Sequence, residues 1–303
     1  MTGRALVTGA GGFLGRHLVA ELERRHHQVT RLRFAFDANG SGLRIQTDDG
    51  VHPAAALDHL VASASPAVIF HLAGTRRPPF MTEVNVGLAL RLVDTLRRLG
   101  LAARLVLIGS AAEYGRVEDD ALPVAETHPC RPLTPYGETK QAQTLLGLEA
   151  AAEGIDVVVA RCFNLIGRGM PADAPLMEIA SRLGASSPSA PVPVGDLDIE
   201  RDFVDVDEAT RCIVGLAANP QARGQVVNVC SGKGMTLREA VRHLVEAVSP
   251  RPTLVPDPSR MRGESIRRMV GDPGRLNALG LSVSPPDFDA LAPVILREAL
   301  NPR

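Results

Sequence analysis

Short apolar runs alternate with amphipathic stretches through the first half of the chain. The runs predict strands at residues 5–8, 29–32, 67–72, 105–108 and 157–160, and the stretches between them predict helices at 13–25, 54–64, 83–99 and 135–153. Strand–helix alternation favours right-handed βαβ units, and nearly continuous apolar strands fit a sheet covered on both faces. The pattern therefore predicts an α/β fold with a doubly wound parallel sheet.

The second half of the chain is less regular. Helices are predicted at residues 207–219 and 236–248, with a strand at 226–229 between them, and the composition of 186–193 and 254–262 is typical of loops. We therefore expect one sheet domain at 1–170, to which 200–228 return. Residues 171–199 and 229–303 would form a smaller C-terminal α/β lobe over its cleft.

Composition narrows the class of protein. The 303 residues are 45% hydrophobic and 22% charged with a net charge of −1, so no basic surplus draws the chain to nucleic acid or an anionic membrane. No apolar run is long enough to span a bilayer, and since the first strand is predicted near Arg4 we expect no signal peptide ahead of it. Cys130, Cys162, Cys212 and Cys230 show no metal or disulfide spacing, so we predict no metal site and expect free thiols in the cytoplasm.

A glycine-rich turn follows the first predicted strand and reaches into the first predicted helix. Gly9, Gly12 and Gly15 are three residues apart, with Phe13 and Leu14 between the last two. The first glycine permits a sharp turn, the second lets backbone N–H groups approach a pyrophosphate, and the third lets the helix pack closely on the sheet. The helix N-terminus then favours the anion. This motif predicts a dinucleotide-binding site in a Rossmann-type domain.

The end of the second strand indicates which dinucleotide binds. An acidic residue there binds the 2′-hydroxyl of the adenine ribose and suits NAD, whereas an arginine suits the 2′-phosphate of NADP. Arg33 stands at that position, with Arg31 nearby. We therefore expect NADP(H) rather than NAD(H). The alternative is that both arginines face solvent and that Asp37 reaches the ribose of NAD(H).

The chain has two tyrosines and two lysines, and one of each lies four residues apart in Tyr136-Gly137-Glu138-Thr139-Lys140. This spacing places a phenol and an ammonium on one helix face. A phenol titrates at about pH 10, and a neighbouring cation lowers that value. Such a pair can exchange a proton with a carbinol or ketone oxygen. The alternative is a half-buried tyrosine with a solvated lysine.

Motifs follow the ends of other strands, where ligands of doubly wound sheets bind. Ser110 follows one of them and could hold a substrate carbonyl oxygen. Together with Tyr136 and Lys140 it resembles the extended short-chain dehydrogenase/reductase family. The resemblance covers nearly the whole chain, in the segments 8–15, 71–74, 85, 110, 136–140, 161–164, 201–206, 228–232 and 262.

The family resemblance implies roles for these residues. Tyr136 would be the acid/base, Lys140 would lower its pKa and hold the nicotinamide ribose, and Ser110 would bond the reacting oxygen. The cofactor site would also include Leu72, Ala73, Gly74, Asn85 and Phe163. Asn164 would contact the sugar, and Arg201 and Arg262 would clamp a diphosphate, which guanidinium groups bind well. The alternative for Arg201 is an ion pair with Asp202 or Asp205.

Within the family, the residues after Ser110 narrow the reaction. Dehydratases carry exchangeable protons where this chain has Ala111 and Ala112, so a dehydratase is disfavoured. Glu113 before Tyr114, together with the segments 194–203 and 257–276, resembles the subgroup that reduces nucleotide-linked 4-keto-6-deoxy sugars such as GDP-4-keto-6-deoxy-mannose. The segment 71–85 is shorter than in that subgroup, and Ser265 replaces its usual aspartate. Both departures leave the sugar and the nucleotide base open.

The sequence thus predicts NADPH-dependent reduction of the 4-keto group of a nucleotide-activated 4-keto-6-deoxy sugar by a cytoplasmic enzyme. The first alternative is an NAD-dependent nucleotide-sugar 4-epimerase with the same triad. The second is a non-catalytic dinucleotide-sensing protein, which would have no reason to keep the triad. The helices at 83–99 and 135–153 resemble those that form a four-helix interface in the family, so we expect a homodimer.

Overall fold

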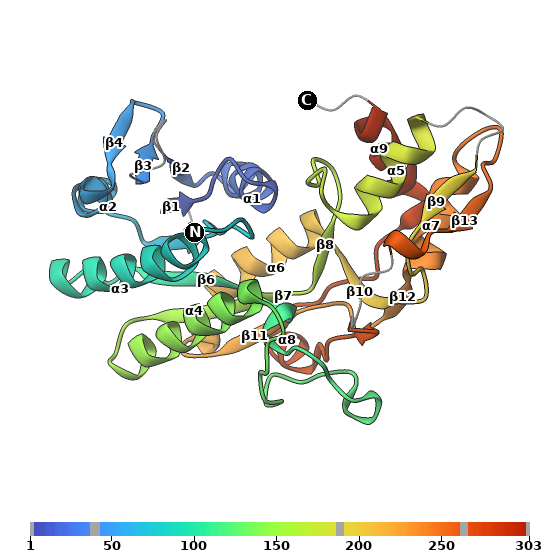
Figure 1. Cartoon of the computed structure of the whole chain (residues 1–303). Helices are drawn as coiled ribbons and strands as arrows, with labels where there is room; N and C mark the ends of the chain where they lie inside the picture. Colours follow the sequence, from blue (N-terminus) through green and yellow to red (C-terminus); the bar gives the residue numbers. More distant parts are fainter. Residues whose placement is uncertain (1–2, 37–42, 186–190, 261–265, 301–303) are drawn as a thin grey trace.

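The computed structural model describes residues 3–36, 43–185, 191–260 and 266–300, in a larger and a smaller lobe (Figure 1). The larger lobe is built on an eight-stranded sheet with the order β11-β7-β6-β5-β1-β2-β3-β4. Its strands are β1 (Arg4–Thr8), β2 (Gln28–Phe36), β3 (Leu43–Gln46), β4 (Val51–Pro53), β5 (Val68–His71), β6 (Arg104–Ser110), β7 (Val157–Cys162) and β11 (Val226–Val229).

The strand order reverses next to β1. The chain passes from β1 to β2 on one side, and β5 pairs with β1 on the other, all in parallel. Thr8 and His71 are register partners at the carboxyl ends of β1 and β5, and Thr8 Oγ1 lies 2.8 Å from His71 Nδ1. This is the topological switch point, where ligands of such sheets bind.

Helices cover both faces of the sheet. One face carries α1 (Phe13–Arg24) and α6 (Val206–Ala218), and the other carries α2 (Leu57–Ala64), α3 (Leu88–Leu99) and α4 (Pro135–Ala152). The buried stripe of α3 includes Leu88, Leu92 and Leu96, with the spacing of an amphipathic helix. The predicted doubly wound α/β fold is confirmed. The antiparallel extension β3–β4 was not predicted, because it consists of two very short edge strands.

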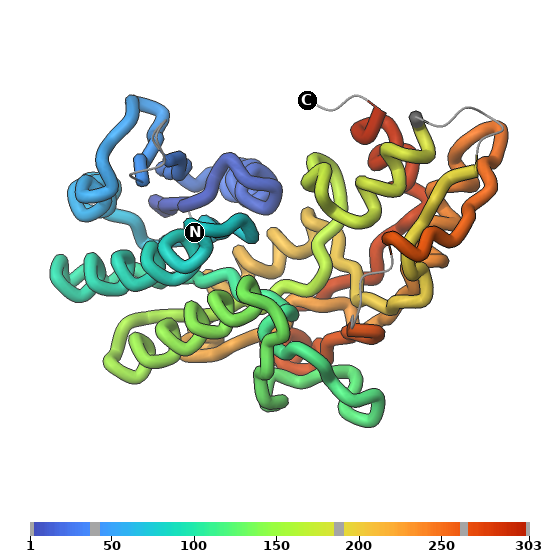
Figure 2. Tube along the Cα trace, in the orientation of Figure 1, coloured from blue at the N-terminus to red at the C-terminus, as the bar shows by residue number. Residues whose placement is uncertain are grey.

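The smaller lobe holds a four-stranded sheet, in which β10 (Glu200–Asp205) pairs with β8 (Asn164–Ile166), β12 (Gly234–Thr236) and β14 (Arg268–Met269). A separate pair joins β9 (Val192–Val194) to β13 (Leu254–Pro256). The helices α5 (Pro175–Ala185), α7 (Leu237–Glu246) and α9 (Phe288–Leu300) share its apolar core. Figure 2 shows α5 in yellow-green beside α9 in red, although they are more than a hundred residues apart.

The segment 200–228, predicted to return to the sheet domain, begins in the small sheet as β10 and then supplies α6 and β11 to the larger lobe. In the predicted C-terminal lobe, α8 (Gly274–Ala278) packs on β11 of the large sheet. The chain therefore crosses between the lobes several times, and the predicted domain boundaries stay a proposal.

The other predicted strands and helices are confirmed to within a few residues at their ends. The loop predictions for 186–193 and 254–262 are wrong in part, because β9 and β13 lie in them and a single 3₁₀ turn covers Pro258–Arg260. These three-residue strands pair with each other across some sixty residues, so local composition does not reveal them. Residues 186–190 and 261–262 lie outside the described part. Within the described ranges, no helix combines the length and the hydropathy that a membrane crossing requires.

Candidate active site

The glycine loop after β1 has the geometry of a phosphate cradle. Gly9 has a φ of +70°, and a Cβ there would lie 2.7 Å from the backbone nitrogen of Ala73. A Cβ at Gly15 would lie 2.1 Å from the Gly9 carbonyl oxygen, so α1 packs against the loop as only glycine allows. Gly12 caps α1 with no side-chain hydrogen bond and no acid in the first turn, which leaves this helix end suited to an anion. Phe13 and Leu14 begin the helix and pack on the cores of the smaller and larger lobe respectively.

Arg33 on β2 lies directly over this loop. A Cβ at Gly11 would be 3.3 Å from the Arg33 Cδ. Asp48, in the turn between β3 and β4, pairs with Arg31 at 2.9 Å and with Arg33 at 3.3 Å. The Arg31 hydrogen bond holds the pKa of Asp48 below its usual value. Sequence reasoning missed Asp48, since the β3–β4 turn that brings it here was not predicted, and Asp37 lies outside the described residues.

Ser110, Tyr136 and Lys140 meet at the carboxyl edge of the sheet. Ser110 ends β6, and Tyr136 and Lys140 lie in the first turns of α4. A Cβ at Gly137 would be 2.6 Å from the carbonyl oxygen of Ala112, so α4 packs tightly on the turn after Ser110. Ser110 forms a hydrogen bond with the Tyr136 hydroxyl. The structure thus brings the three predicted catalytic residues together.

The electrostatics of Tyr136 differ from the sequence-based expectation. Burial raises its pKa, and the Ser110 hydrogen bond and the positive charge of Arg76 only partly oppose this effect. The expectation of a lowered Tyr136 pKa is therefore wrong for the protein alone, because desolvation of the phenolate outweighs the Ser110 hydrogen bond and the Arg76 charge that lower it. Tyr136 is protonated at neutral pH, which suits a proton donor.

Lys140 is almost fully buried, and burial lowers its pKa to about 8, an effect that the negative charge of Glu113 opposes. Its Nζ donates to Gln143 Oε1 at 2.7 Å, and a Cβ at Gly74 would lie 3.7 Å from that Nζ. His71 lies behind it with a pKa lowered to about 3 by burial and by the Lys140 charge, so its ring is neutral.

The loop after β5 carries the other predicted cofactor contacts. Leu72, Ala73 and Gly74 continue from His71 beside the glycine loop. Asn85 is fully buried: its Oδ1 accepts from the Thr75 backbone at 2.7 Å, and its Nδ2 donates to the Thr75 carbonyl and to Thr139 Oγ1. Asn85 therefore ties this loop to α4.

The predicted substrate residues lie on the side of the smaller lobe. Asn164 Nδ2 donates to the Asp202 carbonyl at 3.2 Å. Arg201 donates to the carbonyls of Glu200, Arg267 and Ile266, the last at 2.7 Å. Among the described residues Arg201 pairs with neither Asp202 nor Asp205, so it anchors the chain directly after residues 261–265.

Two further predicted residues stand apart from these. Phe163 is buried in the core, with its ring centroid 6.4 Å from that of Tyr114. Arg262 lies outside the described residues.

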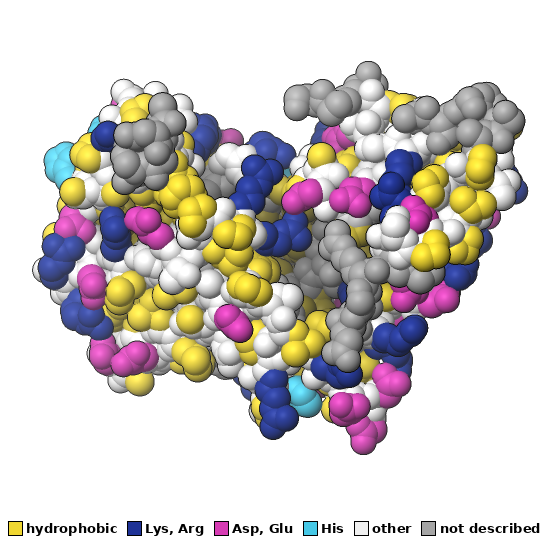
Figure 3. Space-filling view, in the orientation of Figure 1, with side chains coloured by type: hydrophobic (Ala, Val, Ile, Leu, Met, Phe, Trp, Pro, Cys, Tyr) yellow, Lys and Arg dark blue, Asp and Glu magenta, His cyan; other side chains and the backbone are white. Residues whose placement is uncertain are grey.

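Arg76, which sequence reasoning did not single out, connects the two lobes. It extends from the loop after β5 toward Asp173 before α5, at a distance of 3.8 Å between Arg76 Nη2 and Asp173 Oδ1. Figure 3 shows a hollow between the lobes with basic side chains along it.

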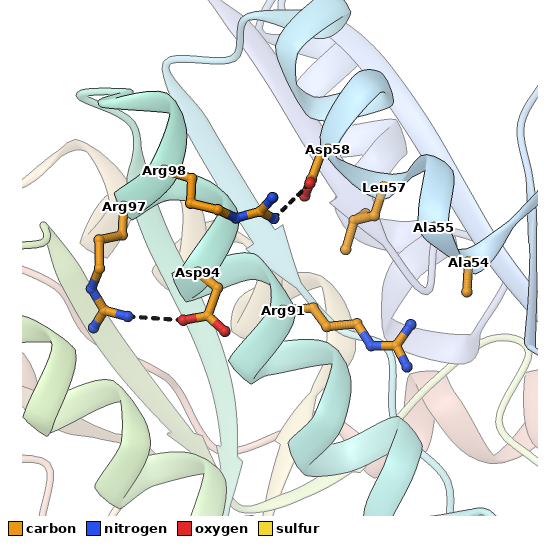
Figure 4. A pocket seen from close by; sticks show the side chains of 8 residues that line it. All are labelled: Ala54, Ala55, Leu57, Asp58, Arg91, Asp94, Arg97 and Arg98. Carbon is orange, nitrogen blue, oxygen red and sulfur yellow. Dashed lines mark hydrogen bonds and ion pairs between the residues drawn. The ribbon is translucent and has the colours of Figure 1, made fainter.

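A pocket of about 470 Å³ lies elsewhere, between the start of α2 and α3 (Figure 4). Its charged lining is already paired: Arg98 with Asp58, and Arg97 with Asp94. None of its lining residues belongs to the predicted site, so we assign it no part in the chemistry.

The chain matches known proteins over most of its length. A model described as the NAD dependent epimerase/dehydratase family matches residues 5–230. GDP-6-deoxy-D-mannose reductase of Pseudomonas aeruginosa is 32% identical over 288 residues, covering 91% of this chain and 90% of the relative. dTDP-6-deoxy-L-talose 4-dehydrogenase (NAD(P)(+)) of Kitasatospora kifunensis is 31% identical over 255 residues, covering 80% and 78%. The solved structure of RMD from Pseudomonas aeruginosa complexed with NADPH is similar with a TM-score of 0.81 at 28% identity, covering 99% of both chains. The resemblance inferred from the motifs is confirmed.

Proposed function

Because the chain belongs to the NAD dependent epimerase/dehydratase family, we propose that it is an NADPH-dependent reductase of the 4-keto group of a nucleotide-activated 4-keto-6-deoxy sugar. The observation that carries this proposal is the meeting of Ser110, Tyr136 and Lys140 beside the glycine loop. The two relatives named above, a 6-deoxy-mannose reductase and a 6-deoxy-talose 4-dehydrogenase, support the 4-position and the 6-deoxy sugar.

The residues of the larger lobe fit a nicotinamide dinucleotide. The α1 N-terminus and the loop of Gly9, Gly12 and Gly15 would hold the pyrophosphate, and Arg33 over Gly11 would hold the 2′-phosphate of NADP(H). The loop of 72–74, positioned by Asn85, would line the same crevice. When bound, the dinucleotide supplies the hydride.

The protein's own contribution is to hold the ketone and to deliver a proton. Ser110 donates a hydrogen bond to the carbonyl oxygen, and the protonated Tyr136 gives its phenolic proton to that oxygen as the alkoxide forms. The Lys140 ammonium then stabilises the tyrosinate that remains. Burial of Lys140 places its ammonium in a low-dielectric site, which strengthens its interaction with the tyrosinate.

The nucleoside diphosphate of the substrate would bind on the smaller lobe. Arg201 and Arg262 are the proposed diphosphate ligands, and Asn164, at the start of β8, is the proposed contact to the sugar. In the structure Arg201 donates to main-chain carbonyls, so binding a diphosphate directly requires it to exchange some of these bonds. A basic hollow between the lobes is suited to such an anion (Figure 3).

We also propose a homodimer through α3 and α4, which pack against each other. Leu90, Leu99, Leu133 and Leu145 on or next to these helices are exposed, and an apolar group of this kind is typical of a protein interface. Light scattering that gives the mass of one chain at micromolar concentration would reject this assembly.

A nucleotide-sugar 4-epimerase is the second candidate, and Asp48 is the observation that favours it. Its carboxylate beside Arg31 and Arg33 places negative charge near the adenine ribose site, where an acid favours the 2′-hydroxyl of NAD. An epimerase would keep NAD bound and show no net consumption of NADPH.

The test is a titration of NADPH and NADH by fluorescence on protein checked for retained dinucleotide, followed by turnover with nucleotide-linked 4-keto-6-deoxy sugars. We expect exchangeable NADPH to bind more tightly than NADH and to be consumed in proportion to the sugar reduced. Retained NAD, with interconversion of 4-epimers and no NADPH consumption, would replace the reductase with the epimerase.

A further inference from the structure

A buried ion pair lies directly beneath the proposed catalytic serine. Glu113, in the single turn after β6, and Arg161, on β7, are 48 residues apart in the chain and almost inaccessible to solvent. Glu113 Oε2 accepts from Arg161 Nε at 3.1 Å and from Nη2 at 2.8 Å. Glu113 Oε1 accepts from the backbone nitrogen of Ser110 at 2.7 Å. The same carboxylate therefore holds both the guanidinium and the main chain of Ser110.

The surroundings of the pair are shaped to hold it. A Cβ at Gly109 would lie 2.6 Å from Glu113 Oε1, so this position leaves room for the carboxylate only as glycine. The Arg161 guanidinium stacks over the Tyr114 ring at 4.6 Å, and the Tyr114 hydroxyl donates to Asn228 Oδ1 at 2.8 Å. The pair is thus fixed from β6, β7, the turn after β6, and β11.

Stability alone does not explain such a pair. Removing two charges from water costs several kcal/mol per ion, and well-packed apolar residues often replace buried pairs without loss of stability. Arg161 Nη1 is also buried with no hydrogen-bond acceptor in the described part of the chain, which adds to the cost. A charged pair kept at this point is better explained by what it does to its neighbours.

We propose that Glu113, held by Arg161, is a positioning residue of the reductase: its carboxylate fixes the main chain of Ser110 and acts electrostatically on Lys140. This inference rests on the proposed function, because it assigns its role through the Ser110–Tyr136–Lys140 triad. The proposal gives a role to Glu113 and Arg161, which lie in the family motifs but are not members of the triad.

The charged and titratable groups around Lys140 support the second part of the proposal. Glu113 faces it from the turn after β6, Cys162 from β7, and His71 from β5. Arg76 acts on Tyr136 from the loop after β5. His71 is neutral and burial raises the pKa of Cys162 to about 12, so the negative charge that acts on Lys140 comes from Glu113, the ion-pair partner of Arg161. Its charge opposes the desolvation that lowers the pKa of Lys140.

The chain offers a direct measurement, because Lys140 and Lys233 are its only lysines. Labelling lysine with ¹³C at Cε gives two NMR signals, which a Lys233→Arg variant assigns, and a pH titration of the Lys140 signal needs no substrate. We expect this signal to titrate at lower pH in Glu113→Gln than in the wild type. The double variant Glu113→Gln with Arg161→Met removes both charges of the pair and so leaves no unpaired buried guanidinium that could impair folding. We expect its Lys140 signal to titrate at lower pH as well.

Turnover provides the second readout. We expect kcat to fall at least about tenfold in the single and the double variant, since both lack the charge that supports Lys140. Tyr114→Phe is the matched control: it keeps the ring under Arg161 and the Glu113 charge, and it removes only the hydroxyl, which bonds Asn228 and also acts on Arg161. It should retain near-normal turnover and Lys140 titration.

A double variant with wild-type Lys140 titration and turnover would overturn the proposal and leave the pair as packing alone. Failure of the charge-balanced double variant to fold would also overturn it, since the pair would then hold the sheet together rather than serve the site. Failure of the proposed function is a separate result: the wild type would reduce no 4-keto sugar, while the NMR titration would still report on Glu113 and Lys140.

Discussion

The two lobes obtain their functional residues in different ways. In the larger lobe, each group of functional residues lies at the carboxyl end of one strand. The glycine loop follows β1, the loop of 72–74 follows β5, and Ser110 is the last residue of β6, so each is placed by the strand next to it in the sequence. In the smaller lobe, β10 gathers β8, β12 and β14 from segments up to about a hundred residues apart. The comparison teaches that the proposed catalytic residues of the larger lobe are placed by local chain order, whereas the proposed binding residues of the smaller lobe depend on long-range strand pairing.

The hydrogen bonds of the two lobes show the same contrast. In the larger lobe the hydrogen bonds lead to a proposed catalytic group, because Glu113 holds the main chain of Ser110 and the Ser110 side chain bonds the Tyr136 hydroxyl. In the smaller lobe Arg201 and Asp202 bond main-chain groups, and Asp202 also accepts from the Ser231 hydroxyl beside them. Changes in the first lobe should therefore alter the chemistry, and changes in the second should alter stability and substrate binding.

The largest expected effect tests the chemical role of the larger lobe. Tyr136→Phe removes the proposed proton donor and leaves the ring in place, so we expect turnover to fall by at least about a hundredfold. NADPH binding should survive, because the glycine loop and Arg33 are untouched. Steady-state kinetics and a fluorescence titration measure both; turnover near the wild-type value would refute the mechanism.

The next effect concerns the smaller lobe. Asp202 is fully buried and accepts from the Ser231 nitrogen and hydroxyl and from the nitrogens of Gly232 and Gly271. Asp202→Asn replaces an acceptor by a donor that faces N–H groups, so we expect a loss of about 2–3 kcal/mol in the free energy of unfolding. Urea denaturation gives the value, and hydrogen exchange should increase mainly in β10, β12 and β14.

Asp205→Asn is the matched control on the same strand. Asp205 caps α6, because its Oδ1 accepts hydrogen bonds from the backbone nitrogens of Asp207 and Glu208. Asparagine caps a helix about as well as aspartate. We expect a change of only a few tenths of a kcal/mol there. Equal losses in the two variants would show that the buried carboxylate does not hold the lobe together.

A smaller effect is expected on dinucleotide affinity at the cofactor site. Arg33→Ala removes the guanidinium over Gly11, so we expect NADPH affinity to fall about tenfold while NADH affinity stays nearly constant. Arg31→Ala is the control, since Arg31 also pairs with Asp48 and with Glu23 but has no contact with Gly11 comparable to that of Arg33. Equal losses for both dinucleotides would remove Arg33 as the determinant of NADP(H) preference.

Much of the larger lobe could be predicted because its signals are local. Gly9, Gly12 and Gly15 mark their own turn, and Tyr136 and Lys140 mark one helix face. Asp48 could not be predicted, because it reaches Arg33 only through the short β3–β4 hairpin. The partnership of Glu113 with Arg161 was equally hidden, since β6 and β7 become neighbours only when the sheet forms. The strands of the smaller lobe are two to six residues long, too short for a periodic pattern.

The smallest effect separates the activity of the larger lobe from its stability. Burial lowers the pKa of Lys140 to about 8 from the ordinary 10.5, so the ammonium is lost as pH rises through about 8. Turnover at that pH should be about half of its plateau, because Tyr136 then lacks the neighbouring cation. Between about pH 8 and 10.5 the unfolded chain binds the proton that the folded chain has released, so this group makes the folded state more stable as pH rises.

Activity and the stability contribution of Lys140 should therefore change in opposite directions over the same pH range. Lys140→Met isolates the stability contribution, because the cysteines and other groups that titrate above pH 8 are common to both proteins. The difference in the free energy of unfolding between wild type and variant should shift in favour of the wild type from pH 7.5 to 9.5 while its turnover declines. A pH-independent difference would mean that Lys140 is not desolvated in the folded protein, and the declining turnover would then have to come from Tyr136 alone.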